Sequence, residues 1–329
     1  MLVTGPPTLD ARGYPFRVGA SPPEDVLRAL WGAMPQQAAG QAEVIVVGTI
    51  FAGLNVEAML PPTEELIAEW KPDLVVREVN EYASAIAAER ARVPHIRVGI
   101  GQAFTEEGGL AYAAPALEDV HPGIVEAIAA TTYVTCFPEI FDPAPFVVRR
   151  FRDPAADVPP KPLPDWWPGD DRPLVYMTFG SVAAAFPAAA AVYRQALEVL
   201  GELPVRALLT VGRELKLGDV PSNVHVEQWV PQADVLAHAA LVICHGGSGT
   251  TLGALAAGRP LVVLPLFADQ PFNAARAGIV GVGMVASVDT LRRAVESVLA
   301  DGSFAAAAAR VAREMRKLPP VDEFLHDVR

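Results

Sequence analysis

Short apolar runs alternate with alanine-rich stretches along most of the chain. The runs are rich in β-branched residues and lack strict apolar–polar alternation, which is typical of strands covered on both faces. We expect strands over Glu43–Gly48, Asp73–Val76, His95–Val98, Leu174–Phe179, Ala207–Val211, Leu241–Cys244 and Leu261–Leu264. We expect helices over Glu64–Trp70, Ala83–Arg92, Ala188–Leu200, Thr251–Ala257 and Leu291–Leu299. Alternation of strand and helix in both halves predicts an α/β protein with parallel sheets.

One proline-rich stretch interrupts this alternation. Residues 149–173 read RRFRDPAADVPPKPLPDWWPGDDRP and show neither helical nor strand periodicity. A long surface loop is one interpretation. A semi-rigid linker between two domains is the better one, because both flanks have α/β patterns of their own. We therefore expect a first domain over 1–150, a linker over 151–172, a second domain over 173–318 and a final segment over 319–329.

Composition and charge exclude several classes of protein. With 51% hydrophobic residues among 329, the chain can bury a core and is not intrinsically disordered. A net charge of −12 argues against nucleic acid and acidic membrane surfaces as partners. The first residues lack the pattern of a signal peptide, and no stretch reaches about 18 uninterrupted apolar residues. Two cysteines, Cys136 and Cys244, cannot form a disulfide framework, so we expect a cytoplasmic protein.

The most informative segment is a glycine-rich turn between a strand and a helix. The strand Leu241–Cys244 is followed by HGGSGT over residues 245–250, and a helix is expected to open at about Thr250. Helix N-termini carry unpaired N–H groups and partial positive charge, and glycines let an anion approach the backbone closely. The turn matches neither the dinucleotide fingerprint nor a P-loop, and taken alone it could be a tight corner.

A second polar pair follows the next strand. Asp269 and Gln270 come soon after Leu261–Leu264, and ligands of open α/β sheets bind at the carboxyl ends of strands. If the two strands are neighbours, a carboxylate and an amide lie beside the anion-binding turn. Such a set suits a phosphorylated sugar, with N–H groups and an imidazole for phosphate and the polar pair for hydroxyls.

The segment from Trp229 to Gln270 (WVPQ…HGGSGT…FADQ) closely resembles the donor-binding signature of family-1 nucleotide-sugar glycosyltransferases. Among these, it is similar to the actinobacterial enzymes that glycosylate macrolides, enediynes and other polyketides. The resemblance covers residues 173–329 and extends more loosely to KPDLVVREVNEYASAIAAERARVPHIRV over 71–98. It implies the GT-B fold, in which two Rossmann-like parallel-sheet domains face each other across a cleft. The first domain would bind the acceptor, the second the donor, and the segment 319–329 would return to the first.

The resemblance also implies a role for each matching donor-site residue. Trp229 would line the nucleotide base, Val230 would read the base edge through its backbone, and Gln232 would lie near base and ribose. His245 would donate to the diphosphate, and Ser181 would lie at the phosphate end of the cleft. The turn that holds the phosphates would consist of Gly247, Ser248, Gly249 and Thr250. Asp269 and Gln270 would bind the hydroxyls of the donor sugar. Two structural alternatives stay open: Trp229 as a core residue and Asp269 as a helix cap.

One departure from the signature bears on the nucleotide. Plant relatives have a glutamate eight positions after the histidine, where it binds the ribose hydroxyls, and this chain has Gly253 there. Loss of a ribose contact fits a deoxyribose donor. We therefore favour a dTDP-sugar as co-substrate over a UDP-sugar.

The catalytic base of the family has no counterpart here. The resemblance implies inversion at the anomeric carbon, with a histidine after the first strand as base and an acidic residue that orients it. Glu78 matches the acidic residue, although a solvated charge at a strand end is the alternative. No Gly-His loop is found, and His95 and His121 are poor substitutes because neither follows a first strand. Either a segment is missing from this sequence or the chain has lost its base.

The remaining expectations concern acceptor, metal and partners. The apolar acceptor candidates of the first domain are Trp31, Phe51, Phe104, Tyr112 and Phe137, although each also suits a core. No spacing of metal ligands recurs, so we expect metal-independent transfer, of the hexosyltransferase type, without a cofactor. The partners would be a nucleotide sugar and a hydrophobic small molecule, and a homodimer is compatible with the pattern. The rivals are a nucleotide-sugar epimerase, a cell-envelope glycosyltransferase and a non-catalytic nucleotide-sugar-binding homologue or activator.

Overall fold

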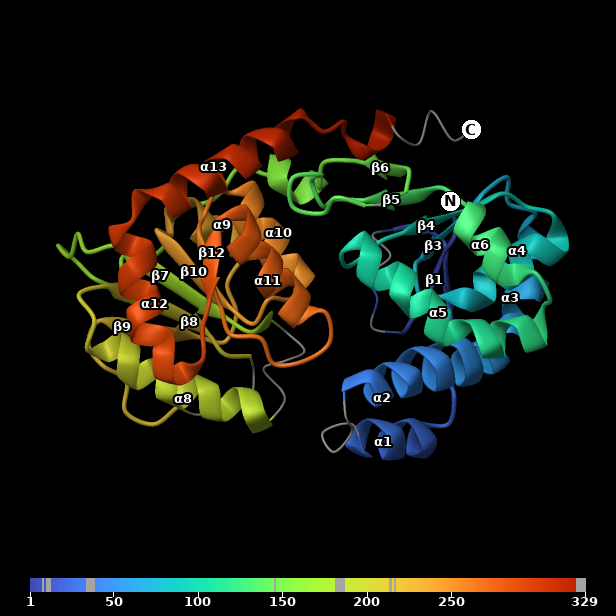
Figure 1. Cartoon of the computed structure of the whole chain (residues 1–329), viewed down its shortest axis with the longest axis horizontal. Coiled ribbons are helices and arrows are strands. Elements are labelled where there is room, and N and C mark those ends of the chain that lie inside the picture. Colours follow the sequence, from blue (N-terminus) through green and yellow to red (C-terminus); the bar gives the residue numbers. More distant parts are fainter. Residues whose placement is uncertain are drawn as a thin grey trace. The chain divides into compact units, whose positions relative to one another are not determined.

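The computed structural model describes most of the chain. It leaves out residues 8, 10–12, 34–38, 145, 181–186, 213, 214, 216 and 324–329, and every statement below concerns the described remainder. The chain divides into two compact units (Figure 1). One comprises residues 1–135 with 146–149, and the other comprises 136–144 and 150–323.

The first unit is α/β, and its described strands lie in two sheets. β1 (Val3–Gly5) and β2 (Phe16–Val18) pair in parallel, and the second sheet has the order β3-β4-β5-β6. The strands of that second sheet are β3 (Val75–Glu78), β4 (His95–Val98), β5 (Tyr133–Thr135) and β6 (Val148–Arg150). The helices are α1 (Glu24–Ala33), α2 (Ala39–Glu43), η2 (Val44–Asn55), α3 (Val56–Trp70), α4 (Tyr82–Ala91), α5 (Ala103–Val120) and α6 (Ile124–Ala130). The apolar core of this unit joins η2, α3, α4, α5 and α6.

The strand predicted over Glu43–Gly48 is wrong. These residues belong to a continuous helical stretch in which η2, a π-helix, runs directly into α3. A short apolar run has the same composition in a buried strand and in an apolar helix, so periodicity could not separate the two.

The helix over 41–70 is long and apolar enough to cross a bilayer, by length and composition only. That is weak evidence, because a core helix of a soluble protein passes the same test.

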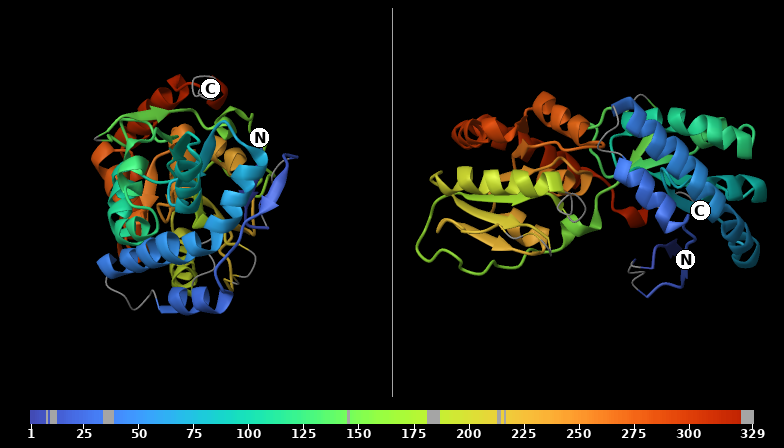
Figure 2. Two further views of the ribbon diagram at one scale, coloured as in Figure 1. Left: turned by 90° about the vertical axis from the view of Figure 1, so that its right-hand side faces the viewer. Right: turned by 90° about the horizontal axis from the view of Figure 1, so that it is seen from below.

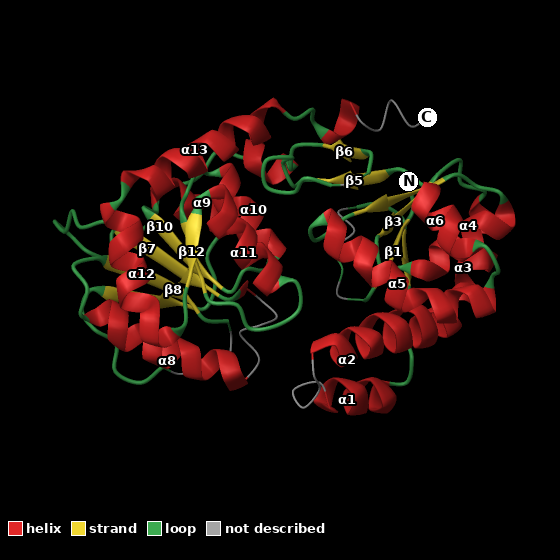
Figure 3. Ribbon diagram, viewed as in Figure 1, coloured by secondary structure: helices red, strands yellow, loops and turns green. Residues whose placement is uncertain are grey.

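The second unit is a doubly wound parallel sheet, which confirms the predicted α/β class (Figure 3). Its strand order is β12-β11-β10-β7-β8-β9. The strands are β7 (Leu174–Thr178), β8 (Arg206–Thr210), β9 (Val224–Glu227), β10 (Leu241–Cys244), β11 (Leu261–Val263) and β12 (Gly283–Val285). Residues of β7, β8, β10 and β11 are buried on both faces, which explains why their sequences do not alternate.

Helices cover both faces of this sheet, as Figure 2 shows from two further sides. α8 (Pro187–Gly201) and α12 (Val288–Ala300) pack in one apolar cluster with one face of the strands. The opposite face carries α9 (Gln232–His238), α10 (Ser248–Ala256), α11 (Gln270–Val280) and α13 (Gly302–Lys317). The chain leaves β7 towards β8 and β9, and then returns to β10 on the other side of β7. The carboxyl ends of β7 and β10 therefore flank the topological switch point, where open α/β sheets bind ligands.

The proline-rich stretch belongs to the second unit and is not a free spacer. After a short 3-10 helix, η3 (Pro154–Asp157), Leu163, Trp166 and Trp167 pack against the core of that unit. The Trp166 ring stacks on His225 at the edge strand β9, with 4.6 Å between ring centroids. The second unit takes up the chain from residue 150 onward and also includes residues 136–144. Aromatic side chains among the prolines bind the segment to the sheet.

The described part of the C-terminal segment also lies in the second unit. Arg152 forms a β-bridge with Pro320, and its N–H donates to the Pro319 carbonyl at 2.8 Å. The guanidinium of Arg152 donates to the carbonyls of Arg316 and Leu318 near the end of α13. Of the segment 319–329 that we predicted to return to the first domain, residues 319–323 belong to the second unit, and residues 324–329 lie outside the described part of the chain.

Candidate functional site

The turn between β10 and α10 has a backbone that requires glycine at two positions. Gly246 has φ +90°, and a Cβ atom there would lie 2.9 Å from the Gln270 carbonyl oxygen and from Val263 Cγ1. Gly247 is the N-cap of α10, and a Cβ there would lie 2.5 Å from His245 Nε2. The predicted glycine-rich turn thus stands at the carboxyl end of β10, with the N-terminus of a nine-residue helix behind it.

His245 is a buried, uncharged imidazole at the switch point. Its side chain packs edge-on against Phe179, with ring centroids 6.0 Å apart, and lies beside Gly180 after β7. Burial lowers the pKa of His245, and the carboxylate of Asp269 only partly opposes this. Its Nδ1 atom is buried and has no hydrogen-bond partner among the described residues. A neutral imidazole with one N–H can donate to an anionic oxygen without a charge of its own.

Hydrogen bonds fix the hydroxyls at the start of α10. Ser248 Oγ donates to Asp269 Oδ2 at 2.9 Å, and Gln232 Nε2 donates to Thr250 Oγ1 at 3.2 Å. Asp269 occupies the N-cap position of α11, as the helix-cap alternative has it, but its side chain makes no capping hydrogen bond to the helix. The structure therefore brings together predicted site residues from the turn, from the loop after β11 and from the start of α9.

Asn273 ties these pieces together, and the sequence analysis missed it. Its Nδ2 atom donates to the Gly246 carbonyl oxygen at 2.8 Å and to Asp269 Oδ2 at 3.0 Å. The side chain is 1% exposed. Asn273 lies four positions after Asp269 and therefore one helical turn along α11, a spacing that could have signalled the contact. It holds the turn and the carboxylate in one arrangement.

Gln270 is buried, and its amide oxygen is bonded within the loop after β11. Its Oε1 atom accepts hydrogen bonds from the backbone N–H groups of Leu266 and Phe267, at 2.8 and 3.0 Å. The side chain is 3% exposed. Its amide oxygen thus closes the loop after β11 in this structure, where Ala268 adopts φ +55°.

Trp229 and Gln232 lie where the loop after β9 meets α9. Trp229 is 74% exposed, so the interpretation as a core residue is wrong, and its ring is accessible for stacking. Val230, by contrast, packs against the core. A Cβ atom at Gly253 would lie 2.9 Å from Gln232 Oε1 and 3.2 Å from Leu236 Cδ1. The glutamine therefore occupies the space over Gly253 on the adjacent helix.

Two further predicted site residues remain, and only one of them is described. Ser181 lies outside the described residues. Glu78 ends β3 in the first unit, where its Oε2 atom accepts the Asn80 N–H at 3.0 Å and its Oε1 atom is buried without a partner among the described residues. Burial raises the pKa of Glu78. The alternative of a fully solvated charge at a strand end is therefore wrong.

The acceptor candidates predicted for the first domain differ in burial and in the unit to which they belong. Phe137 is fully buried, stacks on Phe141 at 5.7 Å and belongs to the core of the second unit, so its assignment to the first domain is wrong. Phe51 packs against the core of the first unit, whereas Trp31, Phe104 and Tyr112 are exposed.

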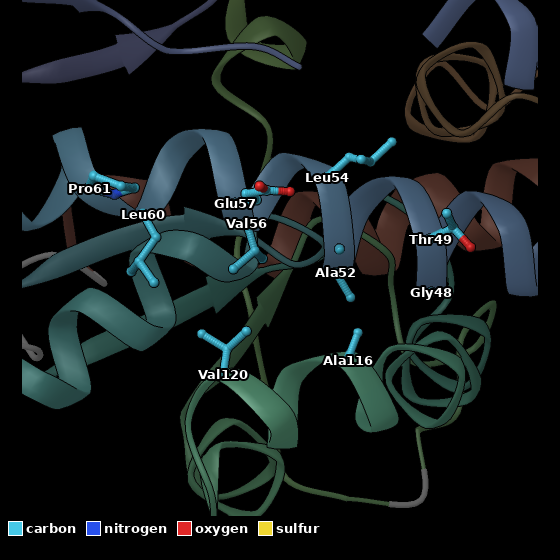
Figure 4. A pocket seen from close by; sticks show the side chains of 11 residues that line it. Gly48, Thr49, Ala52, Leu54, Val56, Glu57, Leu60, Pro61, Ala116 and Val120 are labelled. Atoms are coloured by element: carbon cyan, nitrogen blue, oxygen red, sulfur yellow. The ribbon is translucent and has the colours of Figure 1, made fainter. Parts of the chain in front are cut away.

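The first unit has a cavity of about 620 Å³ that none of these five residues lines. Figure 4 shows Ala52, Val56 and Leu60 on one side of it and Ala116 and Val120 of α5 on the other.

Among the described residues of both units, no group of three or more His, Cys, Asp or Glu side chains could hold a metal ion.

Comparisons with known proteins identify the family. The chain matches the family described as erythromycin biosynthesis protein CIII-like, by its N-terminal domain over residues 35–146 and its C-terminal domain over 194–328. L-demethylnoviosyl transferase of Streptomyces niveus is 31% identical over 277 residues, which cover 79% of this chain and 71% of that protein.

Solved structures agree with this result. Glycosyltransferase SnogD from Streptomyces nogalater has a TM-score of 0.77 and 26% identity, over 96% of this chain and 86% of that chain. Spinosyn rhamnosyltransferase SpnG complexed with thymidine diphosphate has a TM-score of 0.78 and 20% identity, over 99% of this chain and 91% of that chain. The chain therefore belongs to the erythromycin biosynthesis protein CIII-like family and is an enzyme of the glycosyltransferase class, of the natural-product type with the GT-B fold.

Proposed function

We propose that the enzyme transfers a sugar, preferably a deoxysugar, from a dTDP-sugar to a hydroxyl group of a hydrophobic natural-product aglycone, with inversion at the anomeric carbon. The observation that carries the proposal is the glycine-lined turn at the switch point of the second unit, where a buried neutral histidine meets a helix N-terminus. Preorganised N–H groups of this kind stabilise a leaving diphosphate.

The donor would bind across the carboxyl ends of β7 and β10. Trp229 would stack on the base, His245 and the backbone N–H groups at Gly247–Thr250 would hold the diphosphate, and Asp269 would accept hydrogen bonds from the sugar. Gln270 would act through the loop that it closes, since its amide oxygen is already bonded there. No metal ion or cofactor is needed for this arrangement, because dipoles and neutral donors replace the cation.

The preference for dTDP rests on Gly253 and Gln232. A glutamate at position 253 would extend into the space that the Gln232 amide occupies. Without a carboxylate there, the site offers no acceptor dedicated to a ribose 2′-hydroxyl, which deoxyribose lacks. A thymidine diphosphate complex of a protein with the same fold, SpnG, is in keeping with this preference.

In the reaction, an acceptor oxygen forms a bond to C1 of the sugar while the bond from C1 to the diphosphate oxygen breaks. The proton of the acceptor hydroxyl passes to a base, and Glu78 would orient that base or the hydroxyl through its unpartnered Oε1 atom.

We place the reaction in the reducing cytoplasm, because both cysteines are free thiols. Burial raises the pKa of each thiol to about 12, so both are protonated.

A transfer assay tests the proposal. The protein is incubated with dTDP-glucose, dTDP-rhamnose or UDP-glucose and a panel of polyketide aglycones, and mass spectrometry detects glycosides and released nucleotide. We expect glycosides from dTDP-sugars at a higher rate than from UDP-glucose. Equal or faster transfer from UDP-glucose would refute the nucleotide preference. Bound dTDP without transfer to any hydroxylated aglycone would refute the proposed acceptor class.

A further inference from the structure

A second buried carboxyl group lies at the carboxyl edge of the first unit. Glu106, on the first turn of α5, is 7% exposed. Its Oε1 atom accepts the N–H groups of Ile100 and Gly101, at 2.7 and 2.6 Å, and its Oε2 atom accepts the hydroxyl of Tyr133 on β5. The carboxyl group thus binds both amides of the turn that follows β4. The sequence gives no sign of this role, because Glu106 stands in an ordinary acidic first helical turn.

The turn is built closely around this group. A Cβ atom at Gly99 would collide with the Tyr133 hydroxyl and would lie 2.8 Å from Glu106 Oε2. Only glycine fits there, so the backbone passes directly over the carboxyl–tyrosine pair. Ile100, next in the turn, is 57% exposed. The internal contacts of Glu106 therefore determine the position of an exposed apolar side chain at the strand end.

Glu106 lies close to Glu78. Glu78 ends β3 and pairs in register with Val98 at the end of β4, the residue before the Gly99–Gly101 turn that Glu106 binds. Asn80, whose N–H binds Glu78 Oε2, has its side chain beside Gly109 of α5, three positions after Glu106. Residues three apart lie on the same helical face. The loop after β3 and the turn after β4 therefore meet over one face of α5.

The surroundings favour one negative charge on this pair, not two. The pKa of Glu106 is raised to about 8, mainly by burial and to a smaller extent by the charge of Glu78, against the hydrogen bonds from Tyr133 and from the two amides. The other ionisable groups that interact with Glu106 are Tyr82 on α4, Arg97 on β4 and Tyr133 on β5. The repulsion between two neighbouring carboxylates disfavours a negative charge on both.

We propose that Glu106 is a positioning residue for the acceptor side of the reaction: its carboxyl group fixes the Gly99–Gly101 turn beside Glu78 and interacts with the Glu78 carboxyl group across the ends of β3 and β4. The unpartnered Oε1 atom of Glu78 then accepts a hydrogen bond from a donor at the strand ends. The link to catalysis rests on the proposed function, whereas the coupling of the two carboxyl groups is a property of this unit by itself.

Carbon-13 NMR of protein labelled at the glutamate side-chain carboxyls measures the coupling without nucleotide or acceptor. The Glu106 resonance is identified by its absence in Glu106→Gln. We expect it to titrate near pH 8 in the wild type and at lower pH in Glu78→Gln, because the neighbouring charge is removed. In Glu107→Gln, a change at an exposed neighbour, the Glu106 titration should stay unchanged. An unaltered Glu106 titration in Glu78→Gln would overturn the proposal.

Hydrogen exchange of the turn tests the positioning role. Glu106→Ala removes the acceptor of both amides, and we expect at least tenfold faster exchange at Ile100 and Gly101. Glu106→Gln keeps an acceptor oxygen and should stay within about threefold of the wild type. Equal exchange in wild type and Glu106→Ala would contradict the proposal. If the NMR and hydrogen-exchange results are as expected but the protein does not bind dTDP, only the proposed function is refuted, because neither measurement involves the second unit.

Discussion

One added methyl group at Gly247 tests how tightly the turn is built against His245. In Gly247→Ala the new Cβ atom would lie 2.5 Å from His245 Nε2 and 2.7 Å from its Cε1 atom. Non-bonded heavy atoms rest about 3.5–4.0 Å apart, so the imidazole or the turn must move by roughly 1 Å. The backbone of Gly247 (φ −61°, ψ 141°) is accessible to alanine, so the effect is steric and not conformational.

The expected loss of stability in Gly247→Ala follows from the packing around His245. Overfilled buried sites cost about 1–3 kcal/mol, and His245 is 9% exposed. If the imidazole moves away from the diphosphate, the same free energy appears as a loss of about 10- to 100-fold in dTDP affinity. The strain and the loss of affinity both originate in one contact.

Urea denaturation and calorimetric titration with dTDP measure the two effects. Gly249→Ala is a control for the stability measurement alone: a Cβ atom there meets nothing within 4 Å, and alanine replaces a glycine inside α10. That variant should gain about 0.5–1 kcal/mol of stability. Gly247→Ala with wild-type stability and wild-type dTDP affinity would refute the reasoning about the turn.

Four further outcomes follow from the donor-site geometry. Trp229→Ala should leave the thermal midpoint unchanged, since the ring is 74% exposed, and should weaken dTDP binding in calorimetry by about 1–3 kcal/mol of stacking. Asn273→Ala leaves the Gly246 carbonyl without its side-chain donor and should lower the free energy of unfolding in urea by about 1–3 kcal/mol. The pKa of His245 is lower in the folded state than in the unfolded chain, so wild-type stability should fall as the pH drops below about 6.5, more than in His245→Gln; parallel pH profiles would argue against burial as the cause. Gly253→Glu should displace Gln232 and reduce the ratio of dTDP to UDP affinity, and an unchanged ratio would remove the argument from this position.

The second unit was predictable because its local signals agree. The strand over Leu241–Cys244 was predicted with the bounds it has, since glycines follow it and a polar residue cannot continue the buried run. The turn from His245 to Thr250 has a glycine-rich composition, which permits both a tight corner and a close approach of the backbone to a ligand. Even there, the partners of Gln270 and the role of Asn273 depended on the loop after β11, whose path no local pattern determines.

The first unit was less predictable, for physical reasons that differ between elements. The apolar run at Glu43–Gly48 suits a buried strand or an apolar helix equally well, and the helix that continues to Trp70 decided between them. Glu106 acquires its role only through Tyr133, which is 27 residues away on another strand. Long-range contacts of this kind create buried polar groups that periodicity does not reveal.

The central claim is that the turn at Gly246–Thr250 binds the diphosphate of a thymidine nucleotide. Calorimetric titration of the protein with dTDP, UDP and NAD in parallel, repeated with His245→Ala, tests it most directly. We predict tighter binding of dTDP than of UDP, no binding of NAD, and at least tenfold weaker dTDP binding in a His245→Ala variant that keeps its fold. Equal affinity of wild type and His245→Ala for dTDP, or no binding of either nucleotide diphosphate to the folded protein, would contradict the account.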